Sequence, residues 1–139
     1  GIAGDDTHGH VDDLARFVDE RTILLCRESS SSDPNYELLE ENRELAQGFT
    51  LEDGSKLHVE FLPMPQPVVF RGQRLPASYA NFLITNAAVL VPTFNDEADR
   101  TALGIIAEFF PDRKTIGIHA TDLVWGLGTI HCLSQQQPV

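Results

Sequence analysis

Apolar and polar residues alternate along this chain in short blocks, and the blocks predict strands and helices of modest length. Residues 14–18 and 22–27 are apolar segments on either side of a tight polar link, a pattern typical of a β-hairpin. Asp33 before Pro34 is expected to cap a helix with leucine and glutamate on opposite faces. Residues 56–63 alternate in polarity and predict the next strand.

The same order of elements recurs in the second half of the chain. Residues 81–85 and 88–92 predict another hairpin, Asp96 begins a second amphipathic helix, and residues 115–119 predict the strand that follows it. A proline-rich connector, residues 63–76, separates the two copies. The chain therefore reads strand–strand–helix–strand twice, as an α/β protein, although the copies share little sequence.

The last segment, residues 129–137, predicts one further strand. Two units of this kind leave sheet edges without a partner, and proteins rarely leave such edges open. We therefore expect one of two arrangements: an α+β sandwich that closes on itself, or modules of a larger ring.

Composition and charge narrow the class of protein. The 139 residues are 42% hydrophobic, which fits one globular domain. Ten basic against 21 acidic residues give a net charge of −11, which argues against nucleic acid or an anionic membrane as a partner.

No apolar run approaches the roughly 20 residues of a membrane span, and no signal peptide is visible. Two cysteines favour a reducing, cytoplasmic compartment. The chain opens GIAGDD and its only methionine is Met64, so we expect a processed chain or a piece of a longer one.

Reactive groups are dense in residues 4–13, which hold four aspartates and two histidines. His8, His10 and Asp12 alternate, so on an extended segment they could share one face and bind a metal. Two other interpretations stay open. The segment could be a solvated loop, or His10 and Asp12 could place an imidazole beside a carboxylate for acid–base chemistry.

The two cysteines invite different interpretations. Cys26 lies within an apolar strand and is expected to be a buried structural thiol. Cys132 follows glycines that would let the backbone approach a ligand, so it is either another buried thiol or a nucleophile. On a strand His131 and Cys132 would point to opposite faces, so a nucleophilic Cys132 would need a distant partner, and His10 is the obvious one.

Tyr79 and Asn81, in the segment SYANFLITN, are also ambiguous. They could belong to a site, or they could fasten the start of a strand by hydrogen bonds, which is the commoner use of such residues.

Three segments carry a resemblance to a known family: GDDTHGHVDDLARFV, SYANFLITNAAVLVPTFNDEAD and GLGTIHCLSQQQP. In this order, with the motifs G-H-x-D and I-H-C-x-x-Q-Q, the chain resembles the C-terminal part of the agmatine deiminase family, which includes the Porphyromonas-type peptidylarginine deiminases. The resemblance implies the pentein fold, an α/β propeller of five strand–strand–helix–strand modules. This chain would supply about two of them, residues 10–63 and 79–120, with the catalytic cysteine strand at residues 129–137.

The resemblance also implies a reaction and its residues. Cys132 matches the catalytic cysteine, His10 the general acid/base and Asp12 the guanidinium-binding carboxylate, with Asp6 and Gly128 as further substrate-binding residues. The implied reaction is hydrolytic deimination, above all of agmatine to N-carbamoylputrescine and ammonia, a step of putrescine biosynthesis, through a covalent amidino-thioether on the cysteine. No metal or organic cofactor is implied.

Alternatives remain within and outside that class. The substrate could be peptidyl-arginine or another guanidino compound, and the alternative of another class is a non-catalytic or metal-binding module using His8, His10 and Asp12. Four positions depart from the family pattern, and we expect them to alter substrate choice: Asp6, His8, Leu127 and Thr129. A second family carboxylate lies in the N-terminal part. We therefore expect this piece to be inactive without the N-terminal remainder of the enzyme and to associate, as a homo-oligomer or otherwise, through unpaired edges.

Overall fold

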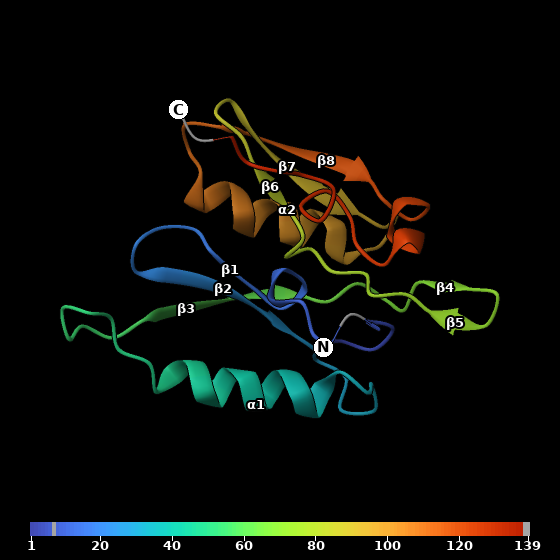
Figure 1. Ribbon diagram of the computed structural model, residues 1–139, viewed down its shortest axis with the longest axis horizontal. Coiled ribbons are helices and arrows are strands. Elements are labelled where there is room, and N and C mark those ends of the chain that lie inside the picture. Colours follow the sequence, from blue (N-terminus) through green and yellow to red (C-terminus); the bar gives the residue numbers. More distant parts are fainter. Residues whose placement is uncertain (7, 138–139) are drawn as a thin grey trace.

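The computed structural model describes residues 1–6 and 8–137 and shows an α/β protein with two three-stranded mixed sheets, a small hairpin and two long helices (Figure 1). In chain order the elements are a 3₁₀ turn η1 (Val11–Asp13), β1 (Ala15–Phe17), β2 (Thr22–Arg27), α1 (Tyr36–Gln47), β3 (His58–Pro63), β4 (Val69–Phe70), β5 (Gln73–Arg74), β6 (Leu83–Ile84), β7 (Ala88–Thr93), α2 (Ala98–Phe109), β8 (Lys114–His119) and η2 (Leu123–Gly126).

The two sheets have the same topology. In the first, β1 is antiparallel to β2, and β2 is parallel to β3 in a register that pairs Leu24 with Glu60. In the second, β6 is antiparallel to β7, and β7 is parallel to β8 with Leu90 opposite Ile116. A parallel pair needs a long crossover, and α1 and α2 supply one for each sheet. The order β–β–α–β therefore occurs twice.

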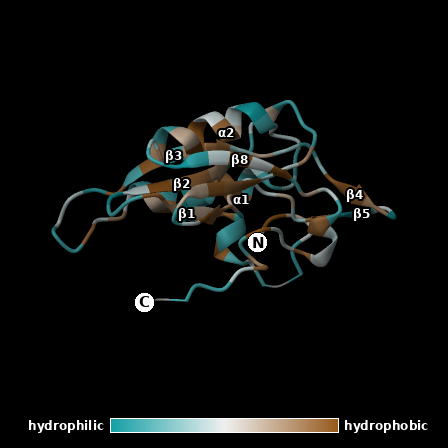
Figure 2. Ribbon diagram, turned by 90° about the horizontal axis from the view of Figure 1, so that it is seen from above, coloured by the Kyte–Doolittle hydropathy of each residue, from teal (hydrophilic) through white to brown (hydrophobic). Residues whose placement is uncertain are grey.

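The elements stack in layers, with α1 on the outside of the first sheet and α2 between the two sheets (Figure 1). The helix α2 contacts both β3 of the first sheet and β8 of the second. The core between the layers is continuous, and the central strands β2 and β7 contribute fully buried side chains such as Leu24, Val89 and Val91. Figure 2 shows the middle of β2 as hydrophobic, whereas the C-terminal segment is hydrophilic.

The helix over residues 36–47 differs from its prediction in two respects. Its N-cap is Asn35, because Asp33 accepts a hydrogen bond from the Asn35 backbone N–H (2.9 Å) and forms an ion pair with Arg74 (2.8 Å). Leu45 was expected on the apolar face but is 57% exposed, while Leu39 is buried. The buried face follows residues 39 and 46, which are seven positions and about two helical turns apart.

The strand expected over residues 129–137 is not formed. Residues 130–133 make a turn instead, in which the Ser134 N–H donates to the His131 carbonyl oxygen (2.9 Å). No neighbouring strand offers a ladder here within the part of the chain that the structure describes. The backbone of the turn bonds instead to a buried side chain before β6, which the next subsection describes.

Two further observations concern the surface. The outer strand β8 is exposed along most of its length, including the apolar Ile116 (40%) and Ile118 (38%), so its free edge is not protected within residues 1–6 and 8–137. No helix in the described residues is both long and apolar enough to span a bilayer.

Candidate active site

Three segments that are far apart in the sequence meet around the side chain of Asn81. They are η1, the loop before β6, and the turn that contains Cys132. Asn81 is completely buried at this junction. A buried amide must satisfy both its oxygen and its nitrogen, and the partners it finds define the site.

The oxygen of the Asn81 amide shapes the cysteine turn. Oδ1 accepts hydrogen bonds from the backbone N–H groups of Thr129 (3.1 Å), His131 (3.1 Å) and Cys132 (3.3 Å). It also accepts from the Thr129 hydroxyl at 2.9 Å. Thr129 is therefore buried and turned toward Asn81, and it supports the turn.

The nitrogen of the same amide faces the reactive groups. Nδ2 lies 3.1 Å from Asp12 Oδ2 and 3.0 Å from Asp13 Oδ1. It also lies 3.0 Å from the sulfur of Cys132. Two N–H groups thus serve three acceptors, and Asn81 joins the two carboxylates of η1 to the thiol. This residue was ambiguous in the sequence, and the structure places it in the site as well as at the start of a strand.

His131 also belongs to the cluster. Its Nδ1 lies 2.7 Å from Asp12 Oδ2, and the Cys132 thiol donates to the same oxygen at 3.2 Å. The expectation that His131 and Cys132 point to opposite faces is wrong, because the two residues lie on a turn and not on a strand. Sequence reasoning missed His131 for that reason.

His10, Asp12 and Cys132 form a compact constellation. Their donor and acceptor atoms all lie within 4.8 Å of one another, with His10 and Cys132 exposed and Asp12 half-buried. Oxygen, nitrogen and sulfur at this spacing could hold a soft divalent cation, or they could serve as acid, base and nucleophile. His8 is exposed, has a φ of +64° and does not belong to this group. Asp6 is exposed, and none of the hydrogen bonds described for Cys132 involves it.

Two local features hold the site in shape. Asp5 Oδ2 accepts from the backbone N–H groups of Gly9 (3.1 Å) and His10 (3.2 Å), which curls the loop that carries the imidazole. Gly128 lies against Cys132, and a Cβ built on the glycine would come within 2.6 Å of the sulfur. Any larger residue at position 128 would therefore collide with the cysteine.

The environment sets the protonation of the thiol and the carboxylates. Burial raises the pKa of Cys132, the Asn81 hydrogen bond opposes that effect, and the charge of Asp12 adds to it. Burial alone would raise the pKa of Asp12, but hydrogen bonds from His131 and Cys132 lower it below its usual value. The resting site therefore pairs an ionised carboxylate with a protonated thiol.

Asp13 behaves differently from its neighbour Asp12. It is only 1% exposed, and its Oδ2 has no hydrogen-bond partner in the described part of the molecule. Burial, followed by the charges of Asp12 and Asp5, raises the pKa of Asp13 to about 7. A proton on this carboxyl leaves Asp12 as the anionic group of the pair near neutral pH.

Two other candidates from the sequence lie behind the site. The Tyr79 hydroxyl donates to Asp99 at 2.7 Å and so fastens the loop before β6 to α2. The thiol of Cys26 is fully buried against the Ser78 hydroxyl, and its burial raises its pKa to about 11. The prediction that Cys26 is a structural thiol is confirmed.

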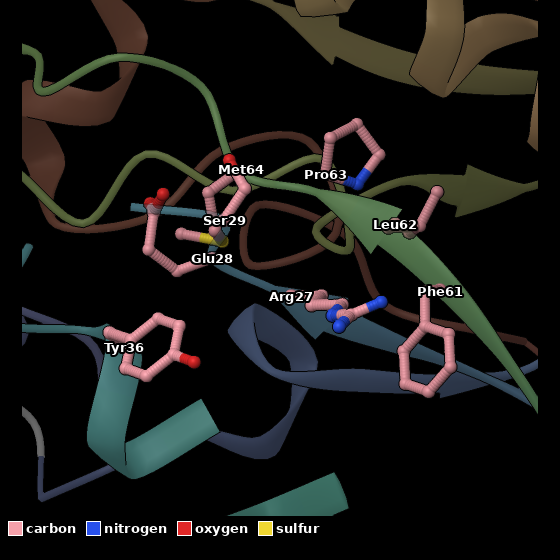
Figure 3. Close-up of a pocket in the computed structure, with 8 residues that line it drawn as sticks. All are labelled: Arg27, Glu28, Ser29, Tyr36, Phe61, Leu62, Pro63 and Met64. Atoms are coloured by element: carbon pink, nitrogen blue, oxygen red, sulfur yellow. The ribbon is translucent and has the colours of Figure 1, made fainter. Parts of the chain in front are cut away.

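Figure 3 shows a hollow of about 440 Å³ at the carboxyl ends of β2 and β3, which shares no residue with this cluster. It is lined by Arg27, Glu28, Ser29, Tyr36, Phe61, Leu62, Pro63 and Met64. The Arg27 guanidinium lies over the Phe61 ring, 5.4 Å from its centre. None of the residues that line this hollow carries a thiol, an imidazole or an aspartate carboxylate.

Taken together, the thiol, the imidazole and the ionised carboxylate on an α/β scaffold define a site suited to nucleophilic catalysis on a cationic group. The sequence profile of the Porphyromonas-type peptidyl-arginine deiminases matches residues 1–138, and the chain belongs to this family.

Individual relatives agree with this placement. A Latilactobacillus sakei protein assigned as a candidate agmatine deiminase is 36% identical over an alignment that covers 99% of this chain and 43% of that protein. Among solved structures, a candidate arginine deiminase from Porphyromonas gingivalis is 44% identical with a TM-score of 0.96, covering 99% of this chain and 41% of the other. The agmatine deiminase of Enterococcus faecalis is 33% identical with a TM-score of 0.90, covering 98% and 43%. The chain thus spans about two fifths of the length of these relatives.

Proposed function

We propose that this chain carries the nucleophile and the acid/base of an enzyme that hydrolyses a guanidino group, with agmatine as the substrate and N-carbamoylputrescine and ammonia as products. The observation that supports the proposal most strongly is the convergence of Cys132, His10 and Asp12. A substrate with a cationic group also suits an acidic protein with a net charge of −11.

Substrate binding is assigned to Asp12. A guanidinium is planar, and a carboxylate can accept two of its N–H groups in parallel. The lowered pKa of Asp12 keeps the carboxylate ionised for this purpose. When the guanidinium binds, its positive charge offsets the negative charge of Asp12 beside the thiol. The pKa of Cys132 then falls and the thiolate, which is the nucleophile, becomes accessible in the presence of substrate.

In the first half-reaction the Cys132 thiolate attacks the central guanidinium carbon and forms a C–S bond. The tetrahedral adduct collapses when one C–N bond breaks, and protonated His10 donates the proton with which that nitrogen leaves as ammonia. The product on the enzyme is an amidino-thioether on the cysteine, and His10 is left neutral.

In the second half-reaction neutral His10 takes a proton from a water molecule, and the water oxygen attacks the same carbon. The C–S bond then breaks and the thiolate returns to Cys132, while the carbon keeps the oxygen as a ureido group. The second proton of the water leaves to solvent, where the released ammonia takes it up as ammonium. One water is consumed and one ammonia is released. His10 ends protonated, ready for the next turnover.

The rest of the enzyme enters this proposal as a structural requirement. We propose that the two β–β–α–β units are two of the five modules of a pentein ring, and that the remaining modules supply a second carboxylate and most of the pocket wall. The relatives are more than twice as long as this chain, which is consistent with that arrangement. Activity is therefore to be measured on the full-length reading frame that contains these residues.

The test is ammonia release by the full-length protein from agmatine and, side by side, from a peptidyl-arginine substrate. We expect ammonia to be released from agmatine. Release from the peptide alone would show that peptidyl-arginine is the substrate. Cys132→Ala should abolish release, whereas normal turnover by that variant would refute the proposal. Metal analysis addresses the alternative of another class: stoichiometric zinc in the purified protein would favour a metal-binding module.

A further inference from the structure

Arg16 connects the two β–β–α–β units directly behind the site. It belongs to β1 of the first sheet, yet its Nη1 donates to the carbonyl oxygens of Ala80 (3.2 Å) and Phe82 (2.6 Å) before β6. Its guanidinium also lies over the Phe82 ring, 4.7 Å from the ring centre. The two carbonyls flank Asn81, so Arg16 holds the backbone on both sides of the residue that organises the cysteine turn.

Arg16 also brings a positive charge to the site from behind. Burial lowers the pKa of Arg16, and the charges of Asp12 and Cys132 oppose that effect. None of the ion pairs within the described residues includes Arg16, so its charge is not neutralised by a carboxylate in contact. An attraction between two charges is mutual, so a guanidinium that gains from a thiolate stabilises that thiolate equally.

We infer that Arg16 is a positioning residue for the proposed deimination, fixing Asn81 from both sides and balancing the charge of the Cys132 thiolate during the covalent step. This inference rests on the proposed function. Arg16 touches neither substrate nor reacting atoms in the proposed mechanism. It acts through its hydrogen bonds on either side of Asn81 and through the electrostatic attraction of its charge for the Cys132 thiolate.

The geometry explains why an arginine suits this position. A guanidinium stays charged at any accessible pH, spreads its donors over a planar fork and stacks on an aromatic ring. A lysine at position 16 would keep the charge but lose the planar group that stacks on the Phe82 ring and holds Nη1 between the two carbonyl oxygens. A glutamine would keep a donor but lose the charge. The two replacements therefore separate the positioning role from the electrostatic role.

The electrostatic role can be measured without any substrate. The full-length protein is treated with iodoacetamide over a range of pH, and carboxamidomethylation of Cys132 is followed by mass spectrometry, because only the thiolate reacts appreciably. We expect Arg16→Gln to slow the reaction at neutral pH by about five- to tenfold and to move the profile to higher pH. Arg16→Lys should keep the wild-type profile.

A matched control removes a guanidinium from the same sheet at a distance from the site. Arg27→Gln deletes a cation on β2 that also lies over a ring and should leave the alkylation profile unchanged. Cys132→Ala gives the background from the buried Cys26. A folded Arg16→Gln protein with a wild-type alkylation profile would overturn the electrostatic part of the inference.

The positioning role is measured by kinetics on agmatine. Arg16→Lys should lower kcat on the order of tenfold without raising KM, because the reacting groups are misaligned while Asp12 still binds the guanidinium. An unchanged kcat in this variant would overturn the positioning part, whether or not Arg16→Gln folds. A wild-type enzyme that fails to release ammonia would instead refute the proposed function, and the alkylation profiles tell the two failures apart.

Discussion

The amide nitrogen of Asn81 lies 3.0 Å from the sulfur of Cys132, although the two residues are 51 positions apart in the sequence. The same side chain, through its oxygen, accepts the backbone N–H of Cys132 at 3.3 Å. Asn81 therefore holds both the main chain and the side chain of the proposed nucleophile. Because its amide is buried, any loss of these bonds leaves unsatisfied polar groups in the interior.

Asn81→Asp should disable the site while it preserves the shape of the side chain. One carboxylate oxygen can still accept the N–H groups of the turn, but the other replaces the amide donor that faces Asp12, Asp13 and Cys132. We expect the free energy of unfolding to fall by about 2–4 kcal/mol at neutral pH and turnover to be lost.

Urea unfolding and ammonia release measure these two effects in the full-length protein. The matched control is Asn86→Asp, which introduces the same charge in the exposed turn between β6 and β7 and should change stability little. Equal stability losses in the two variants would contradict the role assigned to Asn81.

Gly128→Ala tests the close contact between the backbone and the cysteine. The added methyl carbon would lie 2.6 Å from Cys132 Sγ and 2.7 Å from its Cβ. The sulfur could rotate away, but the Cβ cannot, so the turn must shift and misplace the thiol. We expect kcat/KM to fall on the order of 100-fold while the circular dichroism spectrum stays native.

Gly126→Ala is the natural comparison, since nothing lies within 4 Å of a Cβ at that position. This variant should retain turnover close to that of the wild type. If both glycine variants lost activity equally, flexibility of the segment and not the contact at Gly128 would explain the loss.

Asp13→Asn should change how stability depends on pH. The folded-state pKa of Asp13, about 7, is above the usual value of 3.8, so the folded protein binds the extra proton between these two values. The unfolding free energy therefore falls as pH rises from about 4 through 7, by an amount on the order of a few kcal/mol in total. Asparagine does not ionise, so the unfolding free energy of the variant should not show this fall between about pH 4 and pH 7.

Thermal unfolding midpoints at pH 5 and pH 8 measure the effect. We expect Asp13→Asn to be more stable than the wild type at pH 8 and to differ little at pH 5. An exposed control, Asp122→Asn, should leave the dependence unchanged. A wild-type pH dependence in Asp13→Asn would mean that Asp13 does not carry the buried proton.

Local patterns in the sequence predicted most of the regular elements. The strand predicted at residues 22–27 has those bounds in the structure, and the predicted strands near 88–92 and 115–119 lie within one or two residues of β7 and β8. Residues 22–27 and 88–92 are strongly patterned and form central strands with buried side chains, which is where periodicity is informative. The weakly apolar C-terminal segment gave a strand prediction that was wrong, because its backbone bonds to a side chain and not to a neighbouring strand.

The candidate site, like the fold, could be predicted only in part from the sequence. The resemblance to the deiminase family indicated Cys132, His10 and Asp12, and the structure brings these three together. Nothing local indicated that Asn81 would satisfy the cysteine turn, that His131 would bond to Asp12, or that Arg16 would reach across to the loop before β6. Those contacts join residues more than 60 positions apart or depend on the turn at residues 130–133, so they require the tertiary structure.

The most direct test of the central claim is to look for the covalent intermediate on Cys132. Full-length protein is mixed with agmatine, quenched in acid within a turnover and analysed by peptide mass spectrometry. We predict that the peptide containing Cys132 gains the mass of agmatine minus ammonia, and that Cys26 gains nothing. Turnover of agmatine that leaves Cys132 unmodified at every quench time, and that persists in Cys132→Ala, would contradict the account.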